Sequence, residues 1–497
     1  MGARIWCAAV IAGLLPVLAA AQDVTLTSRD GALSISGSLQ GYDGEFFRIS
    51  SAYGALTIDA QGVLCDGPAC PDLTAPKAII RLVGEADAGA ALLPPLVQAF
   101  ARSRGLVYAV AGSGVVMLTD PATDKTLAEI SFMPLPPDQA RAEVKAGRAD
   151  LILASATEPD FGARAVALDA LIPIVAPDNP IPGISTLDLA KALAGEVSNW
   201  AQVGGPDMPL VLHGLDPDSD LQRALSARLG REIVAKVTHP DLAALADAVA
   251  KDPWALAVTG RATAGVARKL ALSDSCGFPL LPSPLAVKAA DYPLTLPIYL
   301  LTPRRRLPLM ARELLEFLAL PAAQTAIAGA GYIDRSPERQ PMTADGLRLI
   351  NAIQGAGEET TLADLKRLVD LMDGADRLSL TFRFEDGSSQ MDASSVENLT
   401  DLARLLEAGV FDDQALTLAG FSDGSGAAAA NLDLSLVRAT GVLAALKRAA
   451  PSLGDDQLPQ VVAFGEALPM ACDETGPGRR LNRRVELWLK PAFGAKP

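Results

Sequence analysis

The chain has 497 residues, and its 58 acidic and 43 basic side chains give a net charge of −15 at neutral pH. This charge repels polyanions and argues against DNA or RNA as a partner. Only two histidines occur, which makes a histidine-based triad or metal site hard to build. We therefore expect a non-enzymatic protein with no catalytic residue, metal or cofactor, although carboxylate or lysine chemistry remains open.

Residues 1–21 have the features of a secretory signal peptide. Arg4 precedes an apolar run, and three alanines end the segment before Gln22. We find no later segment long and apolar enough to span a bilayer. We therefore expect an exported, soluble protein without a transmembrane segment in its mature form.

Residues 22–76 predict a small all-β domain. Short alternating runs such as Val24–Thr27 and Phe46–Ile49 are separated by turns rich in Gly and Asp. Cys65 and Cys70 close a tight turn, and we expect them to form a disulfide in an oxidising compartment. An interaction module and a simple spacer both remain open for this domain.

Residues 77–342 alternate between strands and helices, which predicts an α/β domain with a mostly parallel sheet. A strand at Ile79–Val83 and a helix at Leu92–Ser103 begin the pattern. Cys276 lies near the middle of this domain's second half, and Cys472 lies far beyond it. Two buried thiols and an interdomain bridge are both compatible with the sequence.

Three short motifs in this region read Asp178-Asn179-Pro180, Asn199-Trp200 and Val203-Gly204-Gly205. They resemble the phosphate-type periplasmic solute-binding proteins of ABC transporters. The resemblance covers about residues 78–342 and implies two lobes that close on a ligand. Residues 78–155 and 275–342 would form one lobe, and the intervening segment the other.

The ligand loops depart from that family, which holds a dehydrated oxyanion with hydroxyls, helix N-termini and an arginine. The candidate cleft residues at these positions are Glu85, Asp87, Ser155, Ser219 and Asp220. Carboxylates near a dianion cost free energy in a closed cleft, so we expect that the oxyanion site is lost. Helix caps beside an empty cleft and a site for a cationic or neutral polar solute both remain open.

The periodicity of residues 343–376 predicts two amphipathic helices that link domains. Residues 377–490 predict an α+β domain of order β-α-β-α-β-β with helices on one side of the sheet, followed by a tail at 491–497. One strand ends just before Asp423, and Arg438 follows in a helix that Asn431 can cap. A carboxylate and a guanidinium presented together can bind a zwitterion.

The segment Asn431 to Ala439 reads NLDLSLVRA, and Gly478 to Glu486 reads GRRLNRRVE. These segments resemble the OmpA-like C-terminal domain, which holds proteins of Gram-negative bacteria to diaminopimelate in peptidoglycan. The resemblance implies that Asp423 takes the ammonium and Arg438 the carboxylate. Phe421-Ser422 replaces the His-Thr of the family.

The residues assigned a supporting role around this site are Asn431, Asn482 and Arg483. The two resemblances together imply a multi-domain chain with an all-β unit, a two-lobed α/β domain and an α+β peptidoglycan-binding domain. They also imply a periplasmic location with non-covalent attachment to peptidoglycan, near the inner face of the outer membrane. The alternative function is a wall-tethered receptor that delivers a small solute to an ABC permease.

Overall fold

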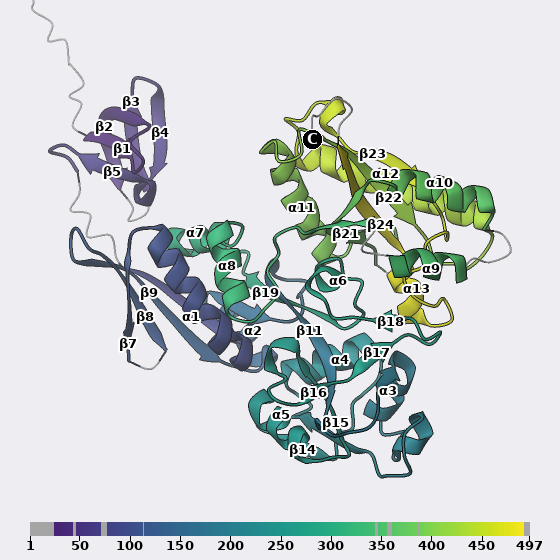
Figure 1. The fold of residues 1–497 in the computed structure, drawn as a ribbon. Coiled ribbons are helices and arrows are strands. Elements are labelled where there is room, and N and C mark those ends of the chain that lie inside the picture. The colour runs from purple at the N-terminus through teal and green to yellow at the C-terminus, as the bar shows by residue number, and fades with distance from the viewer. Residues whose placement is uncertain are drawn as a thin grey trace, which may run out of the picture. The chain divides into compact units, whose positions relative to one another are not determined.

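The computed structural model describes residues 24–42, 46–70, 77–112, 114–342, 346–354, 360–385 and 387–491 (Figure 1). The chain divides into two compact units, residues 1–77 and residues 78–497, and each unit is described by itself. The predicted signal peptide lies outside the described residues.

The first unit is a five-stranded antiparallel sheet of order β4-β3-β2-β1-β5. Its strands are β1 (Val24–Ser28), β2 (Ser34–Tyr42), β3 (Phe46–Ser51), β4 (Gly54–Asp59) and β5 (Val63–Asp66). Alternating residues such as Leu26 and Phe47 are buried in its small core. Cys65 and Cys70 form the predicted disulfide, with their Cα atoms 5.9 Å apart.

The first lobe of the second unit contains a mixed sheet with helices packed against it. Its strands are β6 (Ala78–Gly84), β7 (Val107–Ala111), β8 (Val115–Asp120), β9 (Lys125–Pro134), β10 (Leu151–Ala154) and β19 (Thr295–Thr302). Its helices are α1 (Ala86–Ser103), α2 (Pro137–Lys145), α7 (Leu309–Phe317) and α8 (Pro321–Gly329). Strand β6 pairs in parallel with β9 and β10. Strands β8 and β19 pair antiparallel with their neighbours, so the sheet is mixed and the expectation of a mostly parallel sheet is wrong.

The second lobe continues the same sheet with strands β13 (Val211–Leu215), β14 (Val237–His239) and β15 (Ala255–Gly260). Strand β13 lies between the other two and pairs in parallel with both. Its helices are α3 (Thr186–Leu193), α4 (Asp220–Leu229) and α5 (Leu242–Lys251). The small strands β12 (Gly183–Ser185), β17 (Ala271–Ser273) and β18 (Pro279–Leu280) form a separate sheet, and β16 (Arg268–Lys269) pairs with β11.

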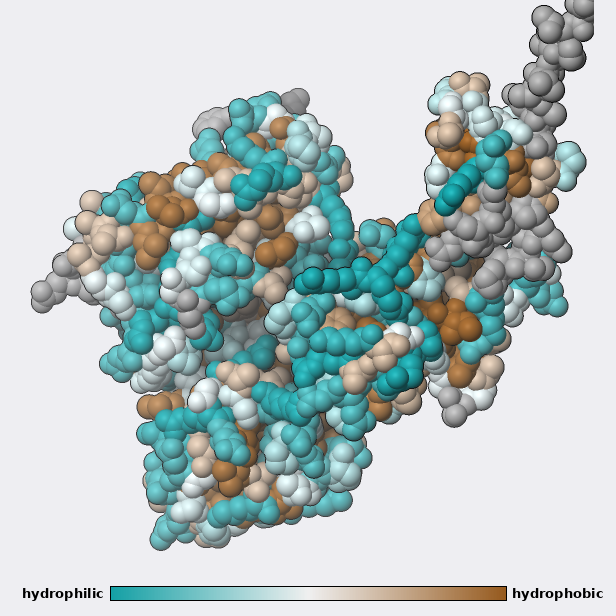
Figure 2. Space-filling view, turned by 180° about the vertical axis from the view of Figure 1, so that it is seen from behind, coloured by the Kyte–Doolittle hydropathy of each residue, from teal (hydrophilic) through white to brown (hydrophobic). Residues whose placement is uncertain are grey.

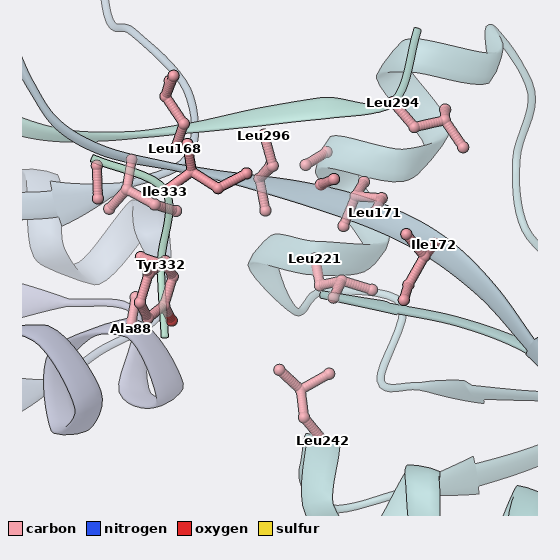
Figure 3. Close-up of a cluster of buried hydrophobic side chains, with 14 of the residues drawn as sticks. Ala88, Leu168, Leu171, Ile172, Leu221, Leu242, Leu294, Leu296, Tyr332 and Ile333 are labelled. Atoms are coloured by element: carbon pink, nitrogen blue, oxygen red, sulfur yellow. The ribbon is translucent and has the colours of Figure 1, made fainter. Parts of the chain in front are cut away.

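One long strand, β11 (Gly162–Val175), belongs to both lobes. Its first part pairs with β19 and its last part pairs with β15. The strand is buried from Ala165 onward, which explains its nearly continuous apolar sequence. Figure 3 shows Leu168, Leu171 and Ile172 on this strand, together with Leu294, which directly precedes β19, and Leu296 in β19.

The C-terminal domain is a five-stranded sheet of order β20-β21-β24-β22-β23. Its strands are β20 (Arg339–Pro341), β21 (Asp376–Arg383), β22 (Gln414–Phe421), β23 (Gln460–Ala463) and β24 (Arg484–Pro491). Helices α11 (Ala393–Glu407) and α12 (Ala428–Ala449) follow β21 and β22, and the short α13 (Gly476–Asn482) precedes β24. The predicted order β-α-β-α-β-β is confirmed, with β20 added at the edge.

Helices cover both faces of this sheet, which differs from the expected one-sided arrangement. Leu418 and Leu487 face α11 and α12, whereas Phe421 and Trp488 belong to a second core. Helices α9 (Gly346–Gln354) and α10 (Leu362–Met372) contribute Ala352, Leu368 and Met372 to that second core. Because Phe421 and Trp488 are large and apolar, the second face also needs a cover.

Helix α12 has the length and composition of a membrane-crossing helix, unlike the expectation from the sequence. Val442 and Leu446 on this helix are nevertheless buried against the sheet. This packing is that of the core helix of a globular domain.

The C-terminal domain contacts both lobes. On the first lobe, Tyr299 Oη lies 2.9 Å from Ser394 Oγ, and Arg335 forms an ion pair with Asp401 at 2.8 Å. Beside the second lobe, Cys276 follows β17 and forms a disulfide with Cys472. The structure therefore resolves the two cysteines as an interdomain bridge.

Candidate functional site

The strand end that carries Asp423 lies very close to α12. A Cβ atom at Gly420 would lie 2.2 Å from the backbone oxygen of Ser435, so only glycine permits this approach of β22 to the helix. The next residues turn away from the sheet, and Ser425 N donates to Asp423 Oδ1 at 3.1 Å. Asp423 lies close enough to Arg438 for the two charges to interact.

Asp423 forms an ion pair with Arg483, whose Nη1 lies 3.1 Å from Oδ2. Burial raises the pKa of Asp423, but hydrogen bonds from Ser425 and Arg483 outweigh it, so the pKa lies below its ordinary value. Asp423 is therefore anionic at neutral pH. Arg483 orients the carboxylate of Asp423 through Oδ2, while Oδ1 accepts from the backbone of the loop at Ser425.

Arg438 is only 4% exposed, and its guanidinium lacks the partners that burial normally requires. Its Nε and Nη1 are buried with no hydrogen-bond partner among the described residues. The guanidinium carbon lies 5.4 Å from the centre of the Phe384 ring, which supports its position. Burial lowers the pKa of Arg438, Arg483 lowers it further, and Asp423 opposes them. A buried guanidinium with unfilled donors favours an anionic ligand.

Asn431 does not cap α12, which corrects the sequence prediction. The helix begins at Ala428, and Ala427 precedes it without a side-chain cap. Alanines are strong helix formers, so this run extends the helix by one turn beyond the predicted start. Asn431 is instead buried, and its Nδ2 donates to Glu466 Oε2 at 2.7 Å.

Asn482 fixes the Asp423 loop through Asp473. Its Oδ1 accepts from the backbone N–H groups of Met470 and Ala471, and its Nδ2 donates to Asp473 Oδ1 at 2.7 Å. The other oxygen of Asp473 accepts from Gly424 N, also at 2.7 Å. Sequence reasoning missed Asp473 because no motif marks it and its partners lie in other segments.

The second candidate site is a cavity of about 490 Å³ between the two lobes. All five candidate cleft residues line it: Glu85, Asp87, Ser155, Ser219 and Asp220. Asp169 and Tyr332 also line it, and sequence reasoning missed both. The one available signal was Asp169 itself, an acid inside the apolar run of β11.

The cavity concentrates carboxyl groups away from water. Burial and the nearby Asp220 raise the pKa of Glu85 to about 8, against an opposing hydrogen bond from Ser155. Burial also raises the pKa of Asp220 and of Asp169 to about 6. Burial and Asp241 raise the pKa of Asp87. At neutral pH the cavity therefore holds a protonated Glu85 among partly ionised neighbours.

The acids of the cleft were expected to be helix caps, but neither α1 nor α4 is capped by an acidic side chain. Ser219 caps α4, because its side chain accepts from Gln222 N at 3.4 Å. Glu85 precedes α1 but makes no side-chain cap, and its Oε1 is buried with no hydrogen-bond partner in the described part of the chain. One carboxyl oxygen of Glu85, Oε1, is therefore left without a partner among the described residues at the cavity wall.

Within the described residues, one group of three side chains has the spacing of metal ligands: Cys276, Cys472 and Glu474. The two sulfur atoms already form the disulfide, which removes them as thiolate ligands. This group does not form a metal site.

Two family models match the chain. Residues 383–483 match the OmpA family, and residues 113–321 match a PBP superfamily domain. The chain therefore carries a PBP-superfamily domain followed by a C-terminal OmpA-family domain.

A curated relative and solved structures were also found. "Phosphate-binding protein PstS" from Borreliella burgdorferi is 47% identical over 53 residues, which are 11% of this chain and 19% of that protein. An ABC-type phosphate transport receptor from Vibrio cholerae matches at 16% identity and a TM-score of 0.42, over 51% of this chain and 99% of the other. A putative phosphate ABC transporter substrate-binding protein from Clostridium perfringens matches at 13% identity and a TM-score of 0.43, over 52% and 99%.

Proposed function

Because the chain carries an OmpA-family domain and a PBP-superfamily domain, we propose that it is a non-enzymatic periplasmic protein that binds peptidoglycan. Asp423 and Arg438 are the two ligand-holding residues. The observation that carries this proposal is the buried guanidinium of Arg438, with two unfilled donors beside the anionic Asp423.

The ligand chemistry follows from these two groups. The side chain of diaminopimelate ends in an ammonium and a carboxylate on one carbon atom. The carboxylate accepts from the guanidinium of Arg438. The ammonium donates to Asp423, which its contact with Arg483 keeps in place. Removing either residue leaves the other charge unpaired and costs about 2–5 kcal/mol of binding free energy.

Co-sedimentation with purified sacculi tests this assignment. Wild-type mature protein should pellet with diaminopimelate-type sacculi, and Arg438→Ala and Asp423→Ala should stay in the supernatant. Arg448→Ala is a matched control, because Arg448 lies on the same helix but near its exposed end. Sacculi with lysine in place of diaminopimelate lack the second carboxylate and should bind weakly. Equal binding to both sacculi would refute the zwitterion assignment.

The same proposal includes loss of the oxyanion site between the lobes. Glu85, Asp87 and Asp220 line the cavity where a phosphate would need positively charged donors. Protonated Glu85 supplies no positive charge, and an ionised Asp87 or Asp220 would repel the phosphate. We therefore expect millimolar phosphate to leave the melting temperature of the mature protein unchanged. A phosphate-induced rise in melting temperature would contradict this part of the proposal.

The second candidate function is a wall-tethered receptor for a cationic or neutral polar solute, delivered to an ABC permease. It is favoured by the unbonded Oε1 of Glu85 in a cavity large enough for a small molecule. A diamine such as 1,4-diaminobutane should then raise the melting temperature, and Glu85→Gln should reduce that rise. No rise with the diamine argues against the receptor and leaves the peptidoglycan tether unaffected.

A further inference from the structure

Another cavity, of about 570 Å³, lies where the C-terminal domain meets both lobes. Neither Asp423 nor the acids of the cavity between the lobes line it. Its walls come from α3 and α4 of the second lobe, from the segment before β19, and from β21, α11 and α13 of the C-terminal domain. Figure 2 shows the surface hollowed where these parts meet. The volume falls in the range of pockets for small organic ligands.

The charged side chains that line this cavity are mostly cationic, with Asp392 as the one acid among its lining residues. Several of the cations are neutralised by neighbours. Lys288 pairs with Asp334 and Glu338, and Arg335 pairs with Asp401. These pairs hold the walls of the cavity together.

Arg228 lacks such a partner. Its Nε donates to the backbone oxygen of Thr295 at 2.6 Å, and its Nη1 donates to the backbone oxygen of Ala224. No carboxylate contacts it among the residues that the structure describes. Burial lowers the pKa of this guanidinium, and Tyr299 alone opposes that effect. Its positive charge is therefore unneutralised at the cavity wall.

Arg383 adds to the positive charge. Its Nη2 lies 2.9 Å from Asp291 Oδ1, but Asp291 also serves Arg377, so one carboxylate is shared between two guanidinium groups. The Nε of Arg383 is buried with no hydrogen-bond partner in the described part of the chain. Burial of an unfilled charged donor is costly unless a partner arrives.

We propose that this cavity binds a small organic anion, whose oxyanion head is neutralised by Arg228 and Arg383 and whose apolar body lies against Leu168, Leu187 and Pro297. Carboxylates and phosphate monoesters share the required head-group chemistry. Because the walls come from both lobes and from the C-terminal domain, the ligand stabilises their assembly by binding only to the folded arrangement.

Fluorine NMR on the mature full chain tests the proposal with three probes. The first two, 4-fluorobenzoate and 4-fluorophenyl phosphate, are anions, and 4-fluorobenzyl alcohol is an uncharged control. At least one anion should show line broadening on addition of protein, and the alcohol should not. The anion with the stronger response identifies the preferred head group.

Two variants locate the binding. Arg228→Gln should weaken binding of the anion at least tenfold, and Leu187→Trp should block the cavity from its partly exposed rim. Arg223→Gln is the matched control, because Arg223 lies on the same helix and pairs with the exposed Asp218. Glu85→Gln should also retain binding, which separates this site from the acidic cavity.

Three results would overturn the proposal. The first is no broadening with either anion at millimolar concentration, and the second is equal binding of the alcohol. The third is unchanged affinity in both Arg228→Gln and Leu187→Trp, provided that both variants unfold at the wild-type temperature. The outcome is independent of peptidoglycan binding, which depends on Asp423 and Arg438.

Discussion

Asp291 and Arg377 form a buried, two-point ion pair that joins the two-lobed domain to the C-terminal domain. Arg377 Nη1 lies 2.5 Å from Asp291 Oδ2, and Nη2 lies 3.1 Å from Oδ1. Arg383 approaches the same carboxylate at 2.9 Å. The two domains thus share a desolvated charge cluster, and neither domain can leave it without exposing unpaired charges.

Asp291→Asn should therefore destabilise the protein strongly. Without the Asp291 carboxylate, the guanidinium groups of Arg377 and Arg383 lose the negative charge that they share. Loss of one partner of a buried ion pair lowers the free energy of unfolding by about 3–5 kcal/mol. Urea unfolding at pH 7 measures the change. Asp160→Asn breaks the exposed pair with Lys145 and should leave the urea midpoint close to that of the wild type. Equal effects of the two substitutions would show that the buried cluster adds no special stability.

Glu85→Gln should stabilise the protein at high pH. Its carboxyl has a pKa raised from 4.5 to about 8 in the folded state, so below pH 4.5 both states keep the proton and stability is unaffected. Between pH 4.5 and 8 the unfolded state loses the proton first, and wild-type stability falls as pH rises. A tenfold difference in proton affinity between the two states corresponds to about 1.4 kcal/mol, so the gain at pH 8 is on the order of a few kcal/mol.

Thermal unfolding of wild type and Glu85→Gln from pH 4 to pH 9 checks this dependence. The two curves should coincide near pH 4 and diverge above pH 5. Glu232→Gln removes an exposed carboxylate and should follow the wild type throughout. A constant offset between Glu85→Gln and wild type at every pH would contradict the assignment to Glu85 titration.

Gly420→Ala and Gly441→Ala should have opposite effects. A Cβ at position 420 meets the Ser435 backbone oxygen at 2.2 Å and forces α12 away from β22, which also separates Asp423 from Arg438. A Cβ at position 441 meets nothing within 4 Å, and replacing glycine inside a helix stabilises by about 0.5–1 kcal/mol. Only Gly420→Ala should unfold at a lower denaturant concentration than the wild type, and only this variant should bind sacculi less well. Wild-type behaviour of that variant would mean that the strand and helix can move apart freely.

Removing the Cys276–Cys472 disulfide should lower stability but preserve peptidoglycan binding. The bridge spans 196 positions, and loss of a native disulfide costs about 2–5 kcal/mol. The ion pairs of Asp291 remain to hold the domains together. Cys276→Ser/Cys472→Ser is therefore expected to unfold at lower urea and still pellet with sacculi. Loss of sacculus binding in this variant would show that the bridge, and not Arg438 alone, controls the binding site.

Much of the fold could be predicted because it is encoded locally. The alternation of β21, the apolar run of β11 and the turn-flanked strands of the first unit follow from side-chain periodicity. Periodicity also predicted the helices between residues 343 and 376, but it could not say which surface they cover. Their position on the second face of the sheet depends on Phe421 and Trp488, which lie far along the chain.

The candidate sites show the same limit. Asp423 and Arg438 were predicted from short motifs, and the acidic residues of the cleft from their places at helix entries. The contacts of Asp423 with Arg483 and of Gly424 with Asp473 span 60 and 49 positions, and no local pattern reports them. Asn431 was misplaced as a cap because an alanine run does not mark its own first helical residue.

The attachment of the C-terminal domain to both lobes restricts how the acidic cavity can exchange its contents. A hinge rotation would have to strain either the disulfide beside the second lobe or the contacts of Tyr299 and Arg335 on the first. When the C-terminal domain is immobilised on a rigid polymer, both lobes are anchored with it. A solute of the kind proposed above would then have to enter through a mouth of nearly constant width, by displacement of water and rearrangement of side chains rather than by a clamshell motion.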